Sequence, residues 1–343
     1  MVRLCLVGVM LFGVLAAACS SQTLESRPRL QPTAAVAPAK PGEVPARALQ
    51  RLTVATSSPS LSWLPAQLAW KLGYFQEEGL DPEFVQVGGT SVVPALLSGE
   101  TAFTTVLSAA AANAAQGGTT QIVQFHSVRL QHVLVVRPDI TTPQQLAGKR
   151  IAVQSLGTLT AHEARKIAEY YNLSDVAILA VGGDLERMAA IESGAADASV
   201  AAIPANLVAE RRGLHSLLRI STILEIPQAG FATSDTHLRD QQGMVASTLR
   251  AAARALPLVT AQRDLVVDTI REWMDLPPED AVRAYEMVAD TFTPNGLPTD
   301  AQMAAYLELL RATAGAPDNV TAAQVADFTI ARRIAQELGL PSQ

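Results

Sequence analysis

The chain has 343 residues, of which 49% are hydrophobic and 17% are charged. This composition supplies enough apolar side chains for one large or two medium folded domains and excludes a wholly disordered chain. The net charge of −6, with no long run of Lys and Arg, argues against a nucleic-acid-binding protein.

The first 18 residues predict a signal peptide. Arg3 precedes an apolar run over 4–18, which is too short to span a bilayer and ends in small residues before Cys19. This arrangement is typical of bacterial lipoprotein signals, although Ala16 stands where those signals usually carry Leu. Because Cys5 would leave with the signal, Cys19 would be the only cysteine of the mature chain and the site of lipidation. The alternative is an ordinary secretory signal followed by a free thiol.

After the signal, residues 19–50 are rich in Pro, Ala, Ser and Gln and predict a flexible tether. Strand and helix patterns then alternate. Strands are predicted over 51–56, 82–87, 102–106, 122–127 and 132–137, and helices over 64–72, 92–99 and 108–116. This alternation predicts a parallel sheet with helices on both faces.

The strand and helix pattern then repeats. The tetrapeptides VGGT at 87–90 and VGGD at 181–184 are 94 residues apart (181 − 87), and the Ser-Gly pairs at 98 and 193 are 95 apart (193 − 98). A near-constant offset predicts two similar α/β units. The composition changes after about residue 240, and 240–343 is predicted to be mostly helical, with breaks at its Pro and Gly residues.

Four segments together resemble a known family. They are WKLGYFQEEGLDPEFV, VGGTSVVPALLSGE, QLAGKRIAVQSLGT and SGAADASV. The chain resembles, in these segments, the lipoprotein type of solute-binding protein of ABC importers for nitrate, taurine and alkanesulfonates, a family that includes binders of thiamine precursors. One departure is Ala102, which stands in the first unit where the family usually has Asp, whereas the second unit keeps Asp197.

The resemblance implies an α/β, periplasmic-binding-protein-like fold, with two α/β lobes, a ligand cleft between them and a helical C-terminal region. Lobe I would comprise 51–138 plus 231–343, and lobe II would comprise 139–230. Hinges are expected near 135–139 and 226–231. Closure of the lobes around the ligand would follow from binding that favours the closed state.

The ligand should lie where the carboxyl ends of the parallel strands meet, because helix N-termini there present free N–H groups. A capping box from Thr160 to Glu163 is predicted to occupy the Thr160 hydroxyl. Each Ser or Thr nearby is, alternatively, a helix cap or turn residue, and Trp63 is alternatively a packing residue. The predicted ligand-binding residues are Ser60, Ser62, Trp63, Gly89, Thr90, Ser91, Leu107, Ser108, Ser155, Gly157, Thr158, Ala202 and Ile203.

Motifs for catalysis and metal binding are missing from the sequence. Val153 breaks a nucleophile elbow around Ser155, and the five His form no H-E-x-x-H pair. We therefore expect no enzyme activity, no cofactor and no metal. Arg129 is expected to be a solvated loop charge, or alternatively a contact for a ligand carboxylate or sulfonate.

The resemblance implies a membrane-anchored protein on the extracytoplasmic face of a bacterial membrane. It would capture a small organic or anionic solute and deliver it to an ABC permease with its ATPase. We expect a monomer that binds no nucleic acid. The alternatives are an enzyme on the same fold, of the pyrimidine-precursor type, and an extracytoplasmic ligand sensor.

Overall fold

The computed structural model describes residues 48–56, 60–87 and 91–341. The predicted signal peptide, the tether up to residue 47 and the lipidation site Cys19 lie outside the described residues. Within the described part of the chain, no helix combines the length and the apolar character that crossing a membrane requires. Arg47–Gln343 form one compact unit, to which the following description is confined.

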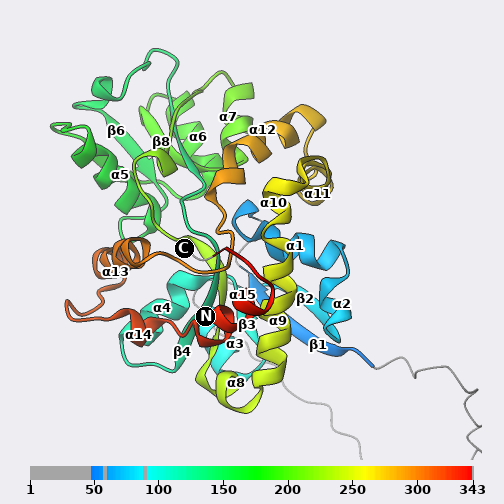
Figure 1. The fold of residues 1–343 in the computed structure, drawn as a ribbon. Coiled ribbons are helices and arrows are strands. Elements are labelled where there is room, and N and C mark those ends of the chain that lie inside the picture. The colour runs from blue at the N-terminus through cyan, green and yellow to red at the C-terminus, as the bar shows by residue number, and fades with distance from the viewer. Residues whose placement is uncertain (1–47, 57–59, 88–90, 342–343) are drawn as a thin grey trace, which may run out of the picture. The chain divides into compact units, whose positions relative to one another are not determined.

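Ten strands form two five-stranded sheets (Figure 1). The strand orders are β2-β1-β3-β10-β4 in the first sheet and β7-β6-β8-β5-β9 in the second. The strands of the first sheet are β1 Gln50–Thr56, β2 Leu80–Gln86, β3 Phe103–Thr104, β4 Thr120–Ser127 and β10 Ala229–Ser234. Those of the second are β5 His132–Val136, β6 Arg150–Val153, β7 Ala177–Ala180, β8 Ala198–Ala202 and β9 His215–Arg219.

The two sheets have equivalent topologies, which confirms the predicted repeat. The β2-β1-β3 segment of the first sheet corresponds to β7-β6-β8 of the second, and all these strands are parallel. The prediction of wholly parallel sheets was wrong for one strand in each sheet. β10 runs antiparallel to β3 and β4, and β5 runs antiparallel to β8 and β9. Both antiparallel strands begin just after the chain has passed from the other sheet.

Strand pairing also locates these passages. The chain leaves the first sheet after Ser127 and enters the second at His132, so the first passage is 128–131. The hinge expected at 135–139 begins inside β5 instead. The return passage follows η3 (Ile220–Thr222) and ends at Ala229, where β10 begins, and it overlaps the second expected hinge. The division into lobe I and lobe II with the expected boundaries stays a prediction.

Helices cover both faces of the sheets, and the strands are correspondingly apolar on both sides. In β5, Val133 and Val135 belong to one hydrophobic cluster, whereas Leu134 and Val136 belong to another. This alternation follows from the two-residue period of a strand. The helices up to the second passage are α1 Leu64–Lys71, α2 Tyr74–Glu77, α3 Val92–Ser98, α4 Leu107–Ala115, α5 Leu159–Tyr170, α6 Asp184–Glu192 and α7 Ala205–Arg211, with short turns η1 Leu61–Trp63 and η2 Pro143–Leu146.

The C-terminal region is helical, as predicted. Its helices are α8 Asp235–Asp240, α9 Gln242–Ala255, α10 Leu258–Ala261, α11 Arg263–Met274, α12 Pro278–Val288, α13 Asp300–Ala314, α14 Ala322–Val325 and α15 Thr329–Glu337, with η4 at Ala289–Thr291. Two ion pairs, Arg211 with Asp280 and Arg283 with Glu210, join α12 to α7. In Figure 1, α12 accordingly lies beside α7, near the second sheet.

Asp197 organises one end of the second sheet. Its carboxylate accepts hydrogen bonds from the backbone N–H of Arg150 at 3.0 Å and from the guanidinium groups of Arg150 and Arg137, at 3.0 and 3.1 Å. The hydrogen bond from Arg150 holds the pKa of Asp197 below its usual range. In the first unit Ala102 occupies the equivalent place, and its N–H donates to the carbonyl of Thr53. The first unit therefore lacks both members of the pair, with Thr53 in place of Arg150 and Ala102 in place of Asp197.

Replacing Asp197 by Ala should lower the free energy of unfolding by roughly 1–3 kcal/mol, because it leaves a part-buried backbone N–H and two guanidinium groups without this acceptor. Chemical denaturation at pH 7 measures this loss. Asp139, which pairs with the same Arg137 but is exposed, provides the matched control, and Asp139→Ala should cost much less than Asp197→Ala. Equal losses in the two variants would contradict this account.

Candidate functional site

A cavity of about 800 Å³ lies between the two sheets. Its wall includes residues that follow β1 and β3 in the first sheet and β6, β7 and β8 in the second. The starts of the two antiparallel strands also contribute, through Ala229 of β10 and His132 of β5. His132 pairs with Ala202, the last residue of β8, which shows that an antiparallel strand begins at the edge where its parallel neighbours end.

Of the thirteen predicted ligand-binding residues, eleven are described, and seven of these line this cavity. They are Ser60, Ser62, Trp63, Leu107, Ser108, Ala202 and Ile203. Gly157 and Thr158 line an adjacent cavity of about 460 Å³, which shares Ser108 with the first. Ser91 and Ser155 line neither cavity. Gly89 and Thr90 lie outside the described residues. The structure thus brings most of the predicted residues together, and their role in binding stays a prediction.

Trp63 packs against other aromatic rings and also lines the cavity. Its ring stacks on Phe84 with centroids 5.1 Å apart and meets the edge of Trp273 at 4.7 Å. Only 4% of the residue is exposed, and the exposed part faces the cavity. Packing therefore fixes the indole in place as a rigid apolar wall.

Local hydrogen bonds occupy several of the predicted hydroxyl groups. Ser60 caps η1 by accepting from the N–H of Ser62, and the two hydroxyls lie 2.9 Å apart. The Thr158 hydroxyl donates to the carbonyl of Ser155 at 2.7 Å. These contacts hold the loops in shape and leave backbone groups and hydroxyl lone pairs for a solute.

The capping box predicted from Thr160 to Glu163 was wrong. Thr158 is the residue that precedes α5, and the Thr160 hydroxyl accepts instead from the N–H of Gln154 at 3.1 Å. The Glu163 carboxylate points elsewhere, to His132. The spacing of Thr160 and Glu163 fits a capping box, but the Glu163 carboxylate forms a hydrogen bond with His132, which is distant in the sequence.

The helix N-termini at the cavity differ in charge. α4 begins at Leu107 with no capping side chain and no acidic residue in its first turn. The N–H of Leu107 donates to the carbonyl of Thr105 at 3.1 Å, and the N–H groups that follow it can meet a negative group. In α6, by contrast, Asp184 and Glu186 lie in the first turn and already complement the helix dipole. The expectation that several helix N-termini would hold an anion therefore fits α4 better than α6.

His132 and Glu163 form a buried pair at the cavity. The imidazole Nδ1 lies 2.6 Å from a carboxylate oxygen of Glu163, whose side chain is 0% exposed. Burial alone would lower the pKa of His132, but the charge of Glu163 and the hydrogen bond to it outweigh burial, and the pKa is raised. His132 is not among the ligand-binding residues predicted from the sequence. The signal that could have found it is its place at the start of the strand that follows a passage between sheets.

Asp184 and Arg187 form a second charged pair in the cavity wall. The Arg187 guanidinium donates from all three of its nitrogens, to the hydroxyl of Ser199, the carbonyl of Gly182 and the carboxylate of Asp184. Only 3% of Arg187 is exposed. Its positive charge is therefore held by the protein's own acceptors. His132, Asp184 and Arg187 are the charged or titratable side chains among the residues that line this cavity.

Other candidates from the sequence lie away from the cavity. Arg129 pairs with Glu225 at 2.7 Å on the surface, which fits the loop-charge interpretation. His126 is fully buried in β4. Among residues 48–56, 60–87 and 91–341, no three His, Cys, Asp or Glu side chains are grouped so that they could hold a metal ion.

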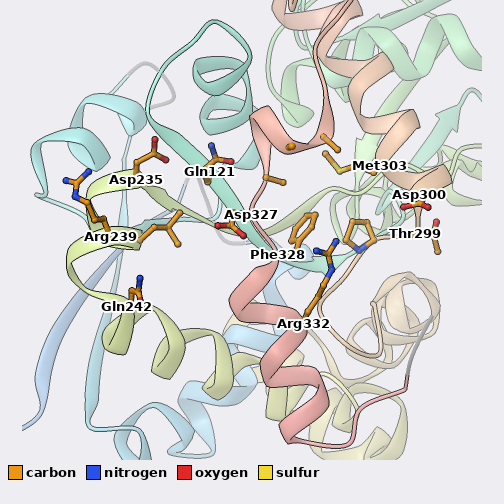
Figure 2. Close-up of a pocket in the computed structure, with 15 residues that line it drawn as sticks. Gln121, Asp235, Arg239, Gln242, Thr299, Asp300, Met303, Asp327, Phe328 and Arg332 are labelled. Carbon is orange, nitrogen blue, oxygen red and sulfur yellow. The ribbon is translucent and has the colours of Figure 1, made fainter.

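A cavity of about 870 Å³ lies elsewhere, at the opposite edge of the first sheet (Figure 2). It includes Gln121 at the start of β4 and Asp235 after the end of β10. Figure 2 shows Asp235 and Arg239 at one end of this groove and Thr299 and Asp300 at the other. Because the carboxyl ends of the parallel strands lie at the other edge, we take the cavity between the sheets as the candidate binding site.

Comparisons with known proteins agree with this geometry. The model of the family described as NMT1/THI5 like matches residues 62–264, more than half of the chain. Among curated proteins, no sequence matches. Two similar solved structures are sulfonate-binding proteins named SsuA. The one from Methylobacillus flagellatus KT, described as putative, shares 18% identity and a TM-score of 0.70, and the match covers 85% of this chain and 96% of that one.

The other, from Xanthomonas axonopodis pv. citri, was solved with MOPS bound, and shares 19% identity and a TM-score of 0.64 over 81% of this chain and 98% of that one. An enzyme also shares the fold. The desulfurization enzyme DSZB has 14% identity and a TM-score of 0.60 over 84% of this chain and 99% of that one. The structural matches establish the periplasmic-binding-protein fold, and with the match over 62–264 the chain belongs to the NMT1/THI5-like family.

Proposed function

We propose that the chain is an extracytoplasmic solute-binding protein that captures a small organic or anionic solute and delivers it to an ABC importer. The observation that carries this proposal is the cavity of about 800 Å³ between the two sheets, a size that suits a small solute. Its wall mixes apolar side chains such as Trp63 and Leu107 with a few polar groups, as ligand sites usually do.

Several features support a sulfonate-like ligand class. The fold is that of the sulfonate-binding SsuA structures. The uncapped N-terminus of α4 offers N–H groups to an anionic oxygen. We extend the proposal to all thirteen predicted ligand-binding residues, nine of which line the two cavities.

The same proposal covers location and partners. The sequence before residue 19 supports export, and lipidation of Cys19 would anchor the protein at the extracytoplasmic face of a membrane. Lobe I over 51–138 and 231–343 and lobe II over 139–230 would close on the solute, and the closed monomer would dock on the permease. Cell fractionation tests the anchor. We expect the wild-type protein in the membrane fraction and the Cys19→Ser variant to be lost from that fraction.

A second candidate function is an enzyme on the same fold. The similarity to DSZB and the His132–Glu163 pair favour it, because a carboxylate-oriented imidazole is a common general base. Thiol chemistry in the cavity is unsupported, since the two cysteines of the chain are Cys5 and Cys19. Mass spectrometry of a bound solute after long incubation separates the two functions, because a binding protein returns its solute unchanged.

A ligand panel tests the proposed function. Thermal unfolding is measured with alkanesulfonates, taurine, nitrate, bicarbonate, a hydroxymethylpyrimidine and riboflavin, and positive compounds are titrated calorimetrically. We expect one chemical class to raise the melting temperature, since a ligand present at 100 times its Kd stabilises the folded state by about 2.7 kcal/mol. If no compound of the panel shifts the melting temperature, the proposed function is contradicted.

A further inference from the structure

The cavity wall contains one titratable side chain that has both a charge and an unused hydrogen-bonding atom. His132 contacts Glu163 through Nδ1, at 2.6 Å. Its second ring nitrogen, Nε2, has no hydrogen-bond partner among the described residues, and the side chain is 11% exposed where it lines the cavity. An imidazole in the wall of a cavity, with one nitrogen fixed by a carboxylate and the other left without a partner, is arranged to bind a ligand.

We propose that Nε2 of His132, oriented by Glu163, donates a charged hydrogen bond to an anionic oxygen of the solute. This inference rests on the proposed function and deepens it, because it names the residue that selects the solute's head group. Glu163 is the positioning residue: it fixes the imidazole through Nδ1 and is not itself among the residues that line the cavity.

The protonation state decides what Nε2 offers. With Nδ1–H donated to the Glu163 carboxylate, a neutral imidazole would present a lone pair at Nε2, whereas an imidazolium presents a second N–H. The charge of Glu163 and its hydrogen bond raise the pKa of His132, so the imidazolium persists to higher pH than in an isolated His. An N–H donor at Nε2 can bind an oxygen acceptor of the solute. The hydrogen bond is strongest when that oxygen is anionic, because the imidazolium is positively charged.

The other charged groups that act on His132 are already paired within the protein. Asp184 and Arg187 of α6 act on His132 in opposite directions, Asp184 raising its pKa and Arg187 lowering it. These two side chains are paired with each other at 2.5 Å. Three of the five N–H groups of Arg187 already donate to the protein, and only 3% of the residue is exposed, so we assign the charged donor for a solute in this wall to Nε2 of His132.

The geometry of the opposite wall is compatible with an anionic head group. α4 of the first unit reaches the cavity through Val106, Leu107 and Ser108 and has no acidic residue in its first turn. An oxyanion between α4 and His132 would meet partial positive charge from one sheet and a full charge from the other. Such a solute would be held by both sheets, as closure requires.

The experiment compares alkanesulfonates of increasing chain length with the neutral alkanesulfonamides of the same lengths, by calorimetric titration between pH 5.5 and 9.5. We expect sulfonate affinity to fall at least 10-fold as pH rises through the pKa of His132, above 6.5, and the neutral sulfonamides to bind more weakly with no such slope. His132→Gln should lose the slope and at least 10-fold in sulfonate affinity at pH 6. His215→Gln, which changes an exposed histidine of β9, is the matched control and should behave like the wild type.

Glu163→Gln provides a readout that a merely structural role would not give. Without the carboxylate, the midpoint of the sulfonate pH profile should move to lower pH while binding below that midpoint is retained. NMR titration of the His132 ring carbon signal measures the same shift without ligand.

The outcomes separate this inference from the proposed function. If sulfonates bind with the same pH profile in His132→Gln, or if only the neutral compounds of the wider panel bind, the assignment of His132 is overturned and the proposed function stands. If no compound binds to the wild type, both are overturned. An unmoved NMR midpoint in Glu163→Gln overturns the role of Glu163.

Discussion

Replacing Ala202 by Trp is expected to abolish solute binding, with a loss of affinity of at least about 100-fold, or roughly 2.7 kcal/mol. Ala202 is the last residue of β8, is partly exposed and lines the cavity between the sheets opposite the residues that follow β1. An indole at this position would occupy volume that a bound solute needs, and a small solute has most of its surface buried in such a site. Calorimetric titration with the sulfonates of the panel measures the loss.

Two variants make this result specific to the cavity. Ala189→Trp places the same side chain at an exposed position of α6 that does not line the cavity, and it should bind like the wild type. Ala205→Trp fills the cavity from α7 and should reproduce the loss. Because overpacking can also destabilise a fold, the melting temperature of each variant is measured without ligand. Undiminished binding in both cavity variants, with native melting temperatures, would remove this cavity as the site.

The sequence predicted those cavity-lining residues that lie at the ends of parallel strands. Ser60 and Ser62 follow β1, Leu107 and Ser108 follow β3, and Ala202 ends β8. These positions depend on local strand and helix patterns and on one general rule of sheet geometry. Because the second unit repeats the pattern of the first, the same rule predicts residues at the strand ends of both units. All the residues named above line one cavity.

Two of the cavity residues that were missed lie at the starts of the antiparallel strands. His132 begins β5, and Gln228 immediately precedes β10. Both line the cavity because a strand that enters the sheet in the opposite direction starts where its neighbours end. Strand direction is a property of how the chain passes between the two sheets, and hydrophobic alternation within a strand does not encode it.

Side-chain partners were harder to predict than positions. Thr160 and Glu163 have the spacing of a capping box, yet Glu163 is 0% exposed and bonded to His132, 31 residues earlier in the chain. A buried carboxylate is stable only with a charged or hydrogen-bonding partner, so the pairing with His132 outweighs a local cap on the helix surface. The burial of Glu163 determines which partner its carboxylate binds, and the four-residue motif does not show that burial.

His126 is expected to make the protein lose stability in acid. It is fully buried in β4, with its ring 4.7 Å from that of Phe231 and its Nε2 3.3 Å from the Gln124 amide oxygen. Burial lowers the pKa of His126 to about 3. The unfolded chain, in which this His keeps a pKa near 6.5, binds the proton first as pH falls. Stability from neutral His126 is therefore complete above pH 6.5 and is lost towards pH 3, by roughly 4 kcal/mol over that window.

Urea unfolding at a series of pH values between 3.5 and 7.5 tests this expectation, with His126→Gln as the variant. The neutral amide cannot take up a proton, so the free energy of unfolding of His126→Gln should depend less steeply on pH than that of the wild type below pH 6.5. A residual slope should remain, because burial also lowers the pKa values of His162 and His237. Replacing the exposed His215 by Gln should leave the wild-type slope in place. Parallel curves for the wild type and His126→Gln would show that His126 is protonated in the folded protein, against the burial that the structure gives it.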